Sequence, residues 1–203
     1  HGIILCDMGK DARKPEPAAS VAAFENLGYN VLGAVKDGGT IEGGDIAWLD
    51  TNTLAVAHGY RTNVKGYHQI KTLLSPFGID VIQVDLPHYK GKSDVFHLMS
   101  IFSPIDENKA VVYSPLMPVR FRELLLKRRF ELIEVPEQEF DSMGCNVLAI
   151  APRDCLMVAG NPITKKLLED AGASVHLYEG SEISVKGGGG PTCLTRPIDR
   201  IIR

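Results

Sequence analysis

The sequence predicts an α/β fold that repeats a unit of strand, strand, helix and strand. An amphipathic helix that leads through a break into a Val-rich strand occurs four times. Its period is roughly 45–50 residues, which is typical of repeat architectures. No linker rich in Ser, Gly or Pro interrupts the chain, so residues 1–203 are expected to form a single domain.

The helices are located by their ends as well as by their apolar spacing. Proline near the start and glycine just past the end are the residues expected at helix termini. The predicted helices cover residues 17–27, 63–77, 118–129 and 162–171, and the strands after them cover 29–35, 79–84, 130–135 and 173–178. The other predicted strands are apolar runs at residues 2–6, 46–49, 53–57, 96–102, 110–113, 146–150 and 155–158.

The alternative for this pattern is a doubly wound fold, in which unrelated strand–helix–strand segments share one open sheet. The strand pairs between the predicted helices argue against it. Short loops join these pairs, whereas parallel neighbours in one sheet need crossover helices.

Composition excludes several classes of protein. A net charge of −3 does not indicate a nucleic-acid-binding protein, and no apolar run is long enough to span a bilayer. No signal peptide is evident, and the four cysteines form no CxxC pair and no zinc-like spacing with histidine. We therefore expect a cytoplasmic protein with reduced thiols and with neither nucleic acid nor membrane as a partner.

Two carboxylates in the segment TIEGGDIAWL (residues 40–49) are the first candidate site residues. Glu42 and Asp45 flank two glycines directly before a strand, so Glu42 can face a pocket while Asp45 anchors the turn. A carboxylate accepts two parallel N–H bonds from a guanidinium, or binds an ammonium. Taken alone, the segment fits a solvated acidic turn equally well.

His97 and Cys193 are the other two candidates. His97 is expected at the start of an apolar strand, on the same face as Met99, and imidazole is the usual proton shuttle near neutral pH. Cys193 follows four glycines and Pro191 in a β-prone stretch, where backbone can approach a ligand and a thiolate can attack an electrophilic carbon. The alternatives are a structural histidine and an inert thiol in a flexible loop.

The remaining cysteines are predicted to be packing residues, because apolar residues surround them. They are Cys6, Cys145 and Cys155. Glutamate, histidine and cysteine occur in this order along the chain. The cysteine supplies a thiol nucleophile, and the acids can hold a cation. This combination suggests a positively charged electrophile.

The order EGGD, FHL and GGGGPTCLT resembles the guanidino-group-modifying enzymes of the pentein superfamily. The closest branch resembles dimethylarginine dimethylaminohydrolase and the arginine-deiminase-related proteins, over essentially the whole chain. The resemblance implies a pseudo-fivefold α/β propeller, of which about four of five units are expected here. An early segment with a guanidinium-binding aspartate has no counterpart, so we expect an amino-terminal truncation that weakens substrate binding.

The resemblance implies a role for each matching residue. Cys193 matches the nucleophile, His97 the general acid/base, and Glu42 the acid that contacts the guanidinium and helps orient the histidine. Arg61 matches the residue that grips the substrate α-carboxylate, the alternative being a surface charge at a helix start. The implied substrate-binding set is Arg61, Asp45 and Gly190, with Asp45 mainly structural.

The implied reaction is hydrolysis of arginine or a methylated arginine to citrulline and an amine, through a covalent intermediate on Cys193. No metal or organic cofactor is required, and the partner is a small guanidino substrate. Met99 stands where arginine and agmatine deiminases carry an aspartate, which favours methylated arginine. Arginine deimination, amidino transfer and a non-catalytic binding module remain alternatives, and a homodimer is left open.

Overall fold

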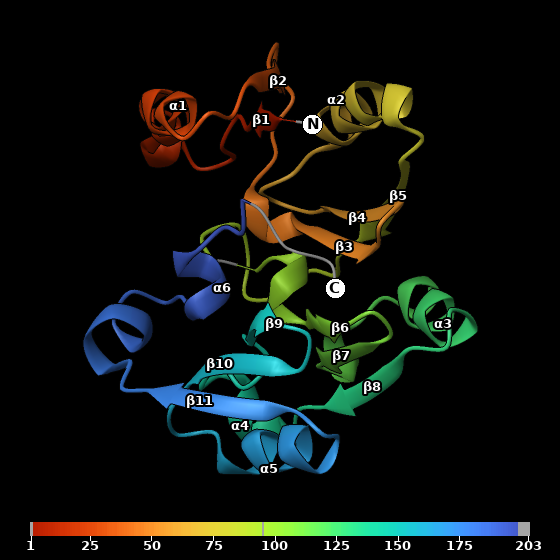
Figure 1. Cartoon of the computed structure of the whole chain (residues 1–203), viewed down its shortest axis with the longest axis vertical. Coiled ribbons are helices and arrows are strands. Elements are labelled where there is room, and N and C mark those ends of the chain that lie inside the picture. Colours follow the sequence, from red (N-terminus) through yellow and green to blue (C-terminus); the bar gives the residue numbers. More distant parts are fainter. Residues whose placement is uncertain (1, 95, 199–203) are drawn as a thin grey trace. The chain divides into compact units, whose positions relative to one another are not determined.

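The structure, a computed structural model, describes residues 2–94 and 96–198 of the chain (Figure 1). The chain forms two compact units, residues 1–98 and residues 99–203. Each unit combines helices with small sheets, and the described strands form four separate sheets of two or three strands. The doubly wound alternative, with one shared open sheet, is therefore wrong.

Three of these sheets share one connectivity. Two strands form an antiparallel hairpin, and a helix then leads to a third strand that pairs in parallel with the second. The three sheets are β3 (Ile46–Asp50), β4 (Thr53–His58) and β5 (Asp80–Asp85); β6 (Phe102–Asp106), β7 (Lys109–Val112) and β8 (Glu131–Glu134); and β9 (Leu148–Ala151), β10 (Asp154–Val158) and β11 (Ser174–Tyr178).

The predicted strand–strand–helix–strand unit is confirmed by these three copies. The helices within them are α2 (Val64–Leu74), α3 (Val119–Lys127) and α5 (Pro162–Asp170). A further parallel pair, β1 (Ile3–Leu5) and β2 (Val31–Ala34), flanks α1 (Glu16–Asn26). The count of four units within a fivefold arrangement stays a prediction.

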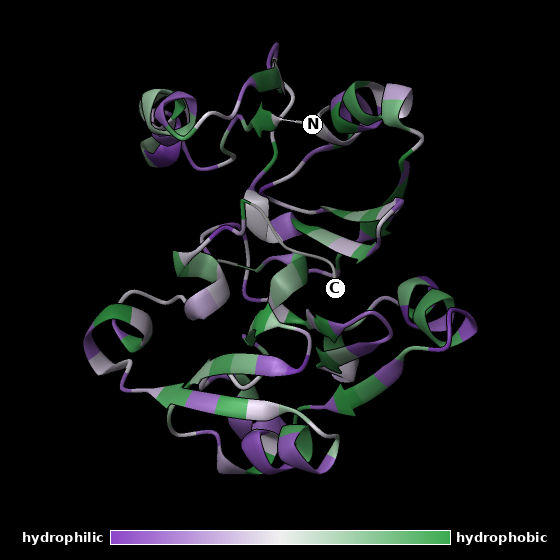
Figure 2. Cartoon of the chain, in the orientation of Figure 1, coloured by the Kyte–Doolittle hydropathy of each residue, from purple (hydrophilic) through white to green (hydrophobic). Residues whose placement is uncertain are grey.

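In the first unit the core lies between β4 and α2. The side chains of β4 are buried along almost the whole strand, because its sequence TLAVAH is a nearly continuous run of apolar residues. Helix α2 turns Tyr67, Ile70 and Leu74 toward this sheet and the Tyr67 hydroxyl donates to the carbonyl of Val81 at 3.0 Å. Figure 2 shows the resulting mixture of hydrophobic and hydrophilic residues along α2.

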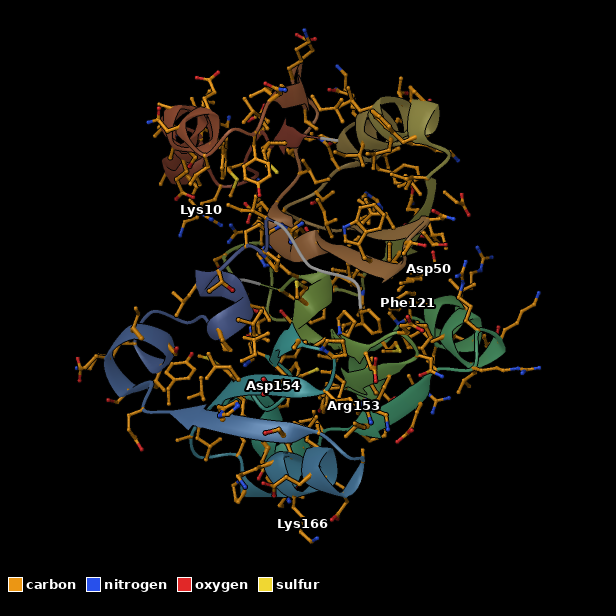
Figure 3. The ribbon with its side chains drawn as sticks, viewed as in Figure 1. Lys10, Asp50, Phe121, Arg153, Asp154 and Lys166 are labelled. Atoms are coloured by element: carbon orange, nitrogen blue, oxygen red, sulfur yellow. The ribbon has the colours of Figure 1, made fainter. Side chains whose placement is uncertain are left out.

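In the second unit aromatic side chains fill the core beneath α3. Phe121, labelled in Figure 3, packs edge-on against Phe102 of β6 with ring centroids 5.2 Å apart. The short helix α4 (Glu137–Phe140) supplies Glu139, whose buried carboxylate accepts from the N–H groups of Ile163 and Thr164. This carboxylate satisfies the unpaired donors at the start of α5, where negative charge is favourable.

Two predicted segments were wrong. Residues 96–102 are not a strand, because a 3-10 turn η4 (Leu98–Ser100) intervenes and β6 begins only at Phe102. The predicted shared strand face of His97 and Met99 is therefore wrong too. Cys193 lies in the short helix α6 (Pro191–Leu194) and not in a β stretch, since Pro191 at the first helical position sets a helical φ.

Candidate functional site

Glu42 is the centre of a buried charged cluster in the first unit. It has extended backbone directly before the 3-10 turn η2 (Gly43–Asp45), and its side chain is 1% exposed. Its Oε2 lies 2.9 Å from Nε2 of His97, at hydrogen-bonding distance. The predicted acid and the predicted proton shuttle are therefore in direct contact.

Two arginines also bind the Glu42 carboxylate. Oε1 accepts from Nη1 of Arg61 at 3.3 Å, and Oε2 accepts from Nη1 of Arg13 at 3.2 Å. The backbone N–H of Lys10, whose side chain is labelled in Figure 3, donates to Oε1 at 3.1 Å. Arg61 is buried, so the alternative of a solvated surface charge is wrong. The carboxylate is thus surrounded by guanidinium groups, the chemical group expected on the substrate.

His97 packs against the backbone of Gly44. A Cβ at position 44 would lie 2.8 Å from Cγ and Nδ1 of the imidazole, closer than side-chain carbons approach. Only glycine admits the ring at this position. The second glycine of the EGGD segment therefore places the histidine beside Glu42.

Asp45 joins the segments that carry these side chains. Its Oδ1 accepts from the backbone N–H of Leu98 at 3.1 Å, which fixes the residue next to His97. Its Oδ2 accepts from Oγ1 of Thr62 at 2.6 Å, and the same oxygen of Thr62 accepts from the N–H of Glu42 at 3.2 Å. All these contacts support the anchoring role expected for Asp45.

The two buried carboxyl groups differ in their electrostatics. Burial raises the pKa of Glu42, but the hydrogen bond and charge of His97, followed by the charges of Arg61 and Arg13, outweigh burial and lower the pKa to about 2. For Asp45 burial dominates and raises the pKa above its ordinary value, against the opposing charge of His97. Glu42 is therefore ionised at neutral pH and forms a fixed negative charge beside the imidazole.

Cys193 occupies an exposed position in the second unit, at the third residue of α6. Its backbone N–H donates to the carbonyl of Gly190 at 3.0 Å. Its Sγ accepts a hydrogen bond from Nδ2 of Asn146 at 3.2 Å. The thiol is thus accessible and is also held by a side chain.

The other thiols of the second unit are enclosed. Cys145 and Cys155 are 1% and 0% exposed, which confirms them as packing residues. Burial raises the pKa of the Cys145 thiol and raises that of Cys155 to about 11. At neutral pH both stay protonated, so Cys193 is the accessible thiol of this unit.

The predicted site residues are distributed over both units. In the first unit the structure brings together Glu42, Asp45, Arg61 and His97. In the second unit Gly190 and Cys193 both contact Asn146. The catalytic and substrate-binding roles assigned from the resemblance stay predictions.

Sequence reasoning missed three side chains that complete these clusters. Arg13 lies in the 3-10 turn η1 (Asp11–Arg13), far from EGGD in sequence, and no local pattern marks it. Thr62 directly follows Arg61, so its position was a usable signal. Asn146 is a buried polar residue at the edge of an apolar strand, a position that demands a hydrogen-bonding partner.

Within residues 2–94 and 96–198 no helix is long and apolar enough to cross a membrane. In the same described residues no three His, Cys, Asp or Glu side chains gather as a metal ion would need.

Comparison with solved structures defines the class as an α/β pentein fold. The apo structure of ArgZ, an arginine dihydrolase from cyanobacteria, matches with a TM-score of 0.81 and 22% identity, over 97% of this chain and 31% of that one. DDAH from Pseudomonas aeruginosa, a cysteine-to-serine mutant complexed with citrulline, matches with a TM-score of 0.72 and 22% identity, over 88% of this chain and 64% of that one. At this identity the similarity shows the fold alone.

Sequence comparison gives the family. The model described as N,N dimethylarginine dimethylhydrolase, eukaryotic, matches residues 1–200, and the chain belongs to this family. The N(G),N(G)-dimethylarginine dimethylaminohydrolase of Streptomyces coelicolor is 31% identical over 95% of this chain and 67% of its own length. Uncharacterized protein YkgA of Bacillus subtilis is 30% identical, over 97% of this chain and 64% of its own length. The chain spans about two thirds of the length of these two relatives.

Proposed function

We propose that the protein hydrolyses the guanidino group of a methylated arginine to give citrulline and an amine. The observation that carries this proposal is the buried, ionised Glu42 hydrogen-bonded to His97 at 2.9 Å. Glu42 already binds the guanidinium groups of Arg13 and Arg61, so it has the charge to bind a substrate guanidinium in exchange for that of the partly exposed Arg13. Family membership and the exposed Cys193 support the same reaction.

The chemistry proceeds in two halves. The thiolate of Cys193 attacks the guanidino carbon, and the bond from this carbon to the methylated nitrogen breaks as His97 gives that nitrogen a proton. The product of this half is a covalent amidino-thioether and a free amine. His97 then takes a proton from water, the hydroxide adds to the same carbon, and the carbon–sulphur bond breaks. Citrulline leaves and the thiolate is restored.

The side chains of the first unit bind and orient in this proposal. Glu42 holds the substrate guanidinium and orients His97 through their hydrogen bond. Arg61 supplies positive charge for the substrate α-carboxylate. Met99 presents a thioether instead of an acid two residues after the histidine, which leaves an apolar neighbour for methyl groups. Asymmetric dimethylarginine is therefore the preferred substrate.

The test is citrulline release from asymmetric dimethylarginine and from arginine, run in parallel with the purified protein. Cys193→Ser should abolish turnover, whereas the matched control Cys155→Ala, which removes a buried thiol of the same unit, should retain it. Turnover of arginine alone would make the protein an arginine deiminase. A Cys193→Ser protein with full activity would exclude the covalent mechanism, and no turnover of either substrate would exclude the proposed function.

A further inference from the structure

Asn146 makes the side-chain contact to the sulphur of Cys193. It lies just before β9, is 8% exposed, and its Nδ2 donates to Sγ at 3.2 Å. Its Oδ1 accepts two hydrogen bonds from Thr192, from the backbone N–H at 3.0 Å and from Oγ1 at 2.9 Å. Because two donors hold the carbonyl oxygen, the amide has one orientation and its NH2 group faces the sulphur.

Gly190 holds the amide in this place. A Cβ at position 190 would lie 2.5 Å from both Cγ and Oδ1 of Asn146, so any side chain there would displace the amide. Asn146 is therefore fixed by Thr192 on one side and by the backbone of Gly190 on the other. Because the amide is already held in place, it loses little conformational entropy when negative charge develops on the sulphur.

We infer that Asn146 is a further catalytic residue, whose amide N–H stabilises the thiolate of Cys193 and aims it at the guanidino carbon. The inference rests on the proposed function of Cys193. An N–H donor binds an anionic sulphur more strongly than a neutral thiol, so it favours the reactive form. The amide keeps its proton throughout and also stabilises the sulphur when it leaves as thiolate in the second half of the reaction.

A purely structural role makes a different prediction. If Asn146 only ties the start of β9 to α6, its loss lowers stability without changing the intrinsic reactivity of the thiol. The second unit offers a matched control in Asn161, which is also buried and hydrogen-bonded, but to Ser142 and to the carbonyl of Val158. Asn161→Asp makes the same chemical change at a position that does not contact the sulphur.

The experiment measures alkylation of Cys193 by iodoacetamide between pH 5 and pH 10, quantified by mass spectrometry of its peptide. Asn146→Asp keeps the oxygen facing Thr192 but points a second oxygen at the sulphur, and Asn146→Ala removes the donor together with the oxygen that accepts from Thr192. Both should slow alkylation at pH 7 by between about tenfold and a hundredfold, the strength of a hydrogen bond to a charged group. The midpoint of the pH–rate profile should move to higher pH, while Asn161→Asp stays within about twofold of wild type.

Wild-type rates and midpoints in both Asn146 variants would overturn the inference, even if citrulline release established the proposed function. Alkylation needs no turnover, so the two failures are distinguishable. If the Asn146 variants are alkylated slowly but the protein turns over no guanidine, the result supports the amide–thiolate interaction and contradicts the proposed substrate. Thermal melting of each variant identifies any that fail to fold.

Discussion

At the scale of single residues, Glu42 shows how a buried carboxylate can stay charged. Burial alone would neutralise it, yet His97, Arg61 and Arg13 together shift the balance toward the ionised form. For Asp45, which is 1% exposed in the same cluster, burial is the largest influence on the pKa and raises it. The two carboxyl groups therefore contribute to stability with opposite dependence on pH.

We predict that Glu42 stabilises the folded protein at neutral pH and that acid removes this contribution. Its folded pKa of about 2 lies below its ordinary value of 4.5, so the stability is present above pH 4.5 and is lost as pH falls through 2. The difference in free energy of unfolding between wild type and Glu42→Gln should shrink by about 3 kcal/mol between pH 5 and pH 2. Urea titrations at each pH measure it.

Asp45→Asn provides the opposite control. Because burial raises the pKa of Asp45, the stability linked to its protonated form is present at low pH and is lost as pH rises through the folded pKa. The advantage of wild type over Asp45→Asn should therefore grow as pH falls. Parallel pH dependence in the two variants would contradict the electrostatic assignment of both groups.

Thr62 should matter for activity as well as stability. Its hydroxyl links Asp45 to the N–H of Glu42, so Thr62→Val leaves a buried carboxylate oxygen without that donor and frees the Glu42 backbone. We expect a loss of about 1–3 kcal/mol in stability. We also expect a fall in kcat of about tenfold or more, since small displacements of catalytic groups are costly. Thr62→Ser keeps the hydroxyl and should restore both, and a valine variant with wild-type kcat would show that Thr62 only stabilises the fold.

The sequence could single out Glu42, His97 and Cys193 because their side chains are chemically reactive and because glycines stand close to Glu42 and Cys193. It could not identify Arg13 or Asn146, whose importance arises from hydrogen bonds to residues 29 and 47 positions away. Nor could it give the reason for Gly44 and Gly190. Both are required by the close approach of another side chain, which only the folded chain displays.

At the scale of elements, helix ends were the most reliable sequence signal. The predicted ends of α1, α3 and α5 lie within two residues of the observed ones, and α2 continues as the 3-10 turn η3 (Ser75–Phe77). The short elements η4, α4 and α6 were missed. Their hydrogen bonds are too few to leave a periodic pattern, and tertiary contacts such as that between Asp45 and Leu98 hold them in place.

Helix α3 ends without the glycine that follows the other long helices. We predict that its end is strained and lowers the stability of the folded protein. Arg129 has a left-handed backbone with φ of 62°, and Phe130 donates to the carbonyl of Leu125. Arg129→Gly removes the strain of a Cβ in this region, although glycine is more flexible in the unfolded chain. We expect a net gain of about 0.5–1 kcal/mol in the free energy of unfolding, measured by urea denaturation.

Gly172 after α5 is the matched control. It has φ of 83°, and the next residue donates to a helix carbonyl five residues back, as at the end of α3. Gly172→Ala should therefore destabilise by about 1 kcal/mol. If Arg129→Gly also destabilised the protein, the unfolded-state entropy of glycine would outweigh the relief of strain at this helix end.

At the scale of the whole molecule, the boundary between the two compact units falls after Leu98, inside the 3-10 turn η4. A domain boundary normally falls in an exposed polar linker, whereas Leu98 is fully buried and its N–H is held by Asp45. The single domain predicted from the sequence stays a prediction, and calorimetry tests it. One cooperative unfolding transition should therefore be observed by calorimetry.

Core variants in each unit test this cooperativity. Leu54→Ala in β4 and Met157→Ala in β10 each remove a buried side chain, at a cost of about 2–5 kcal/mol. For a chain of this length each kcal/mol lowers Tm by about 2–4 °C. If both units unfold together, both variants shift one and the same transition. If the units are independent, two transitions appear and each variant shifts only its own, because the stability lost in one unit is then not shared by the other.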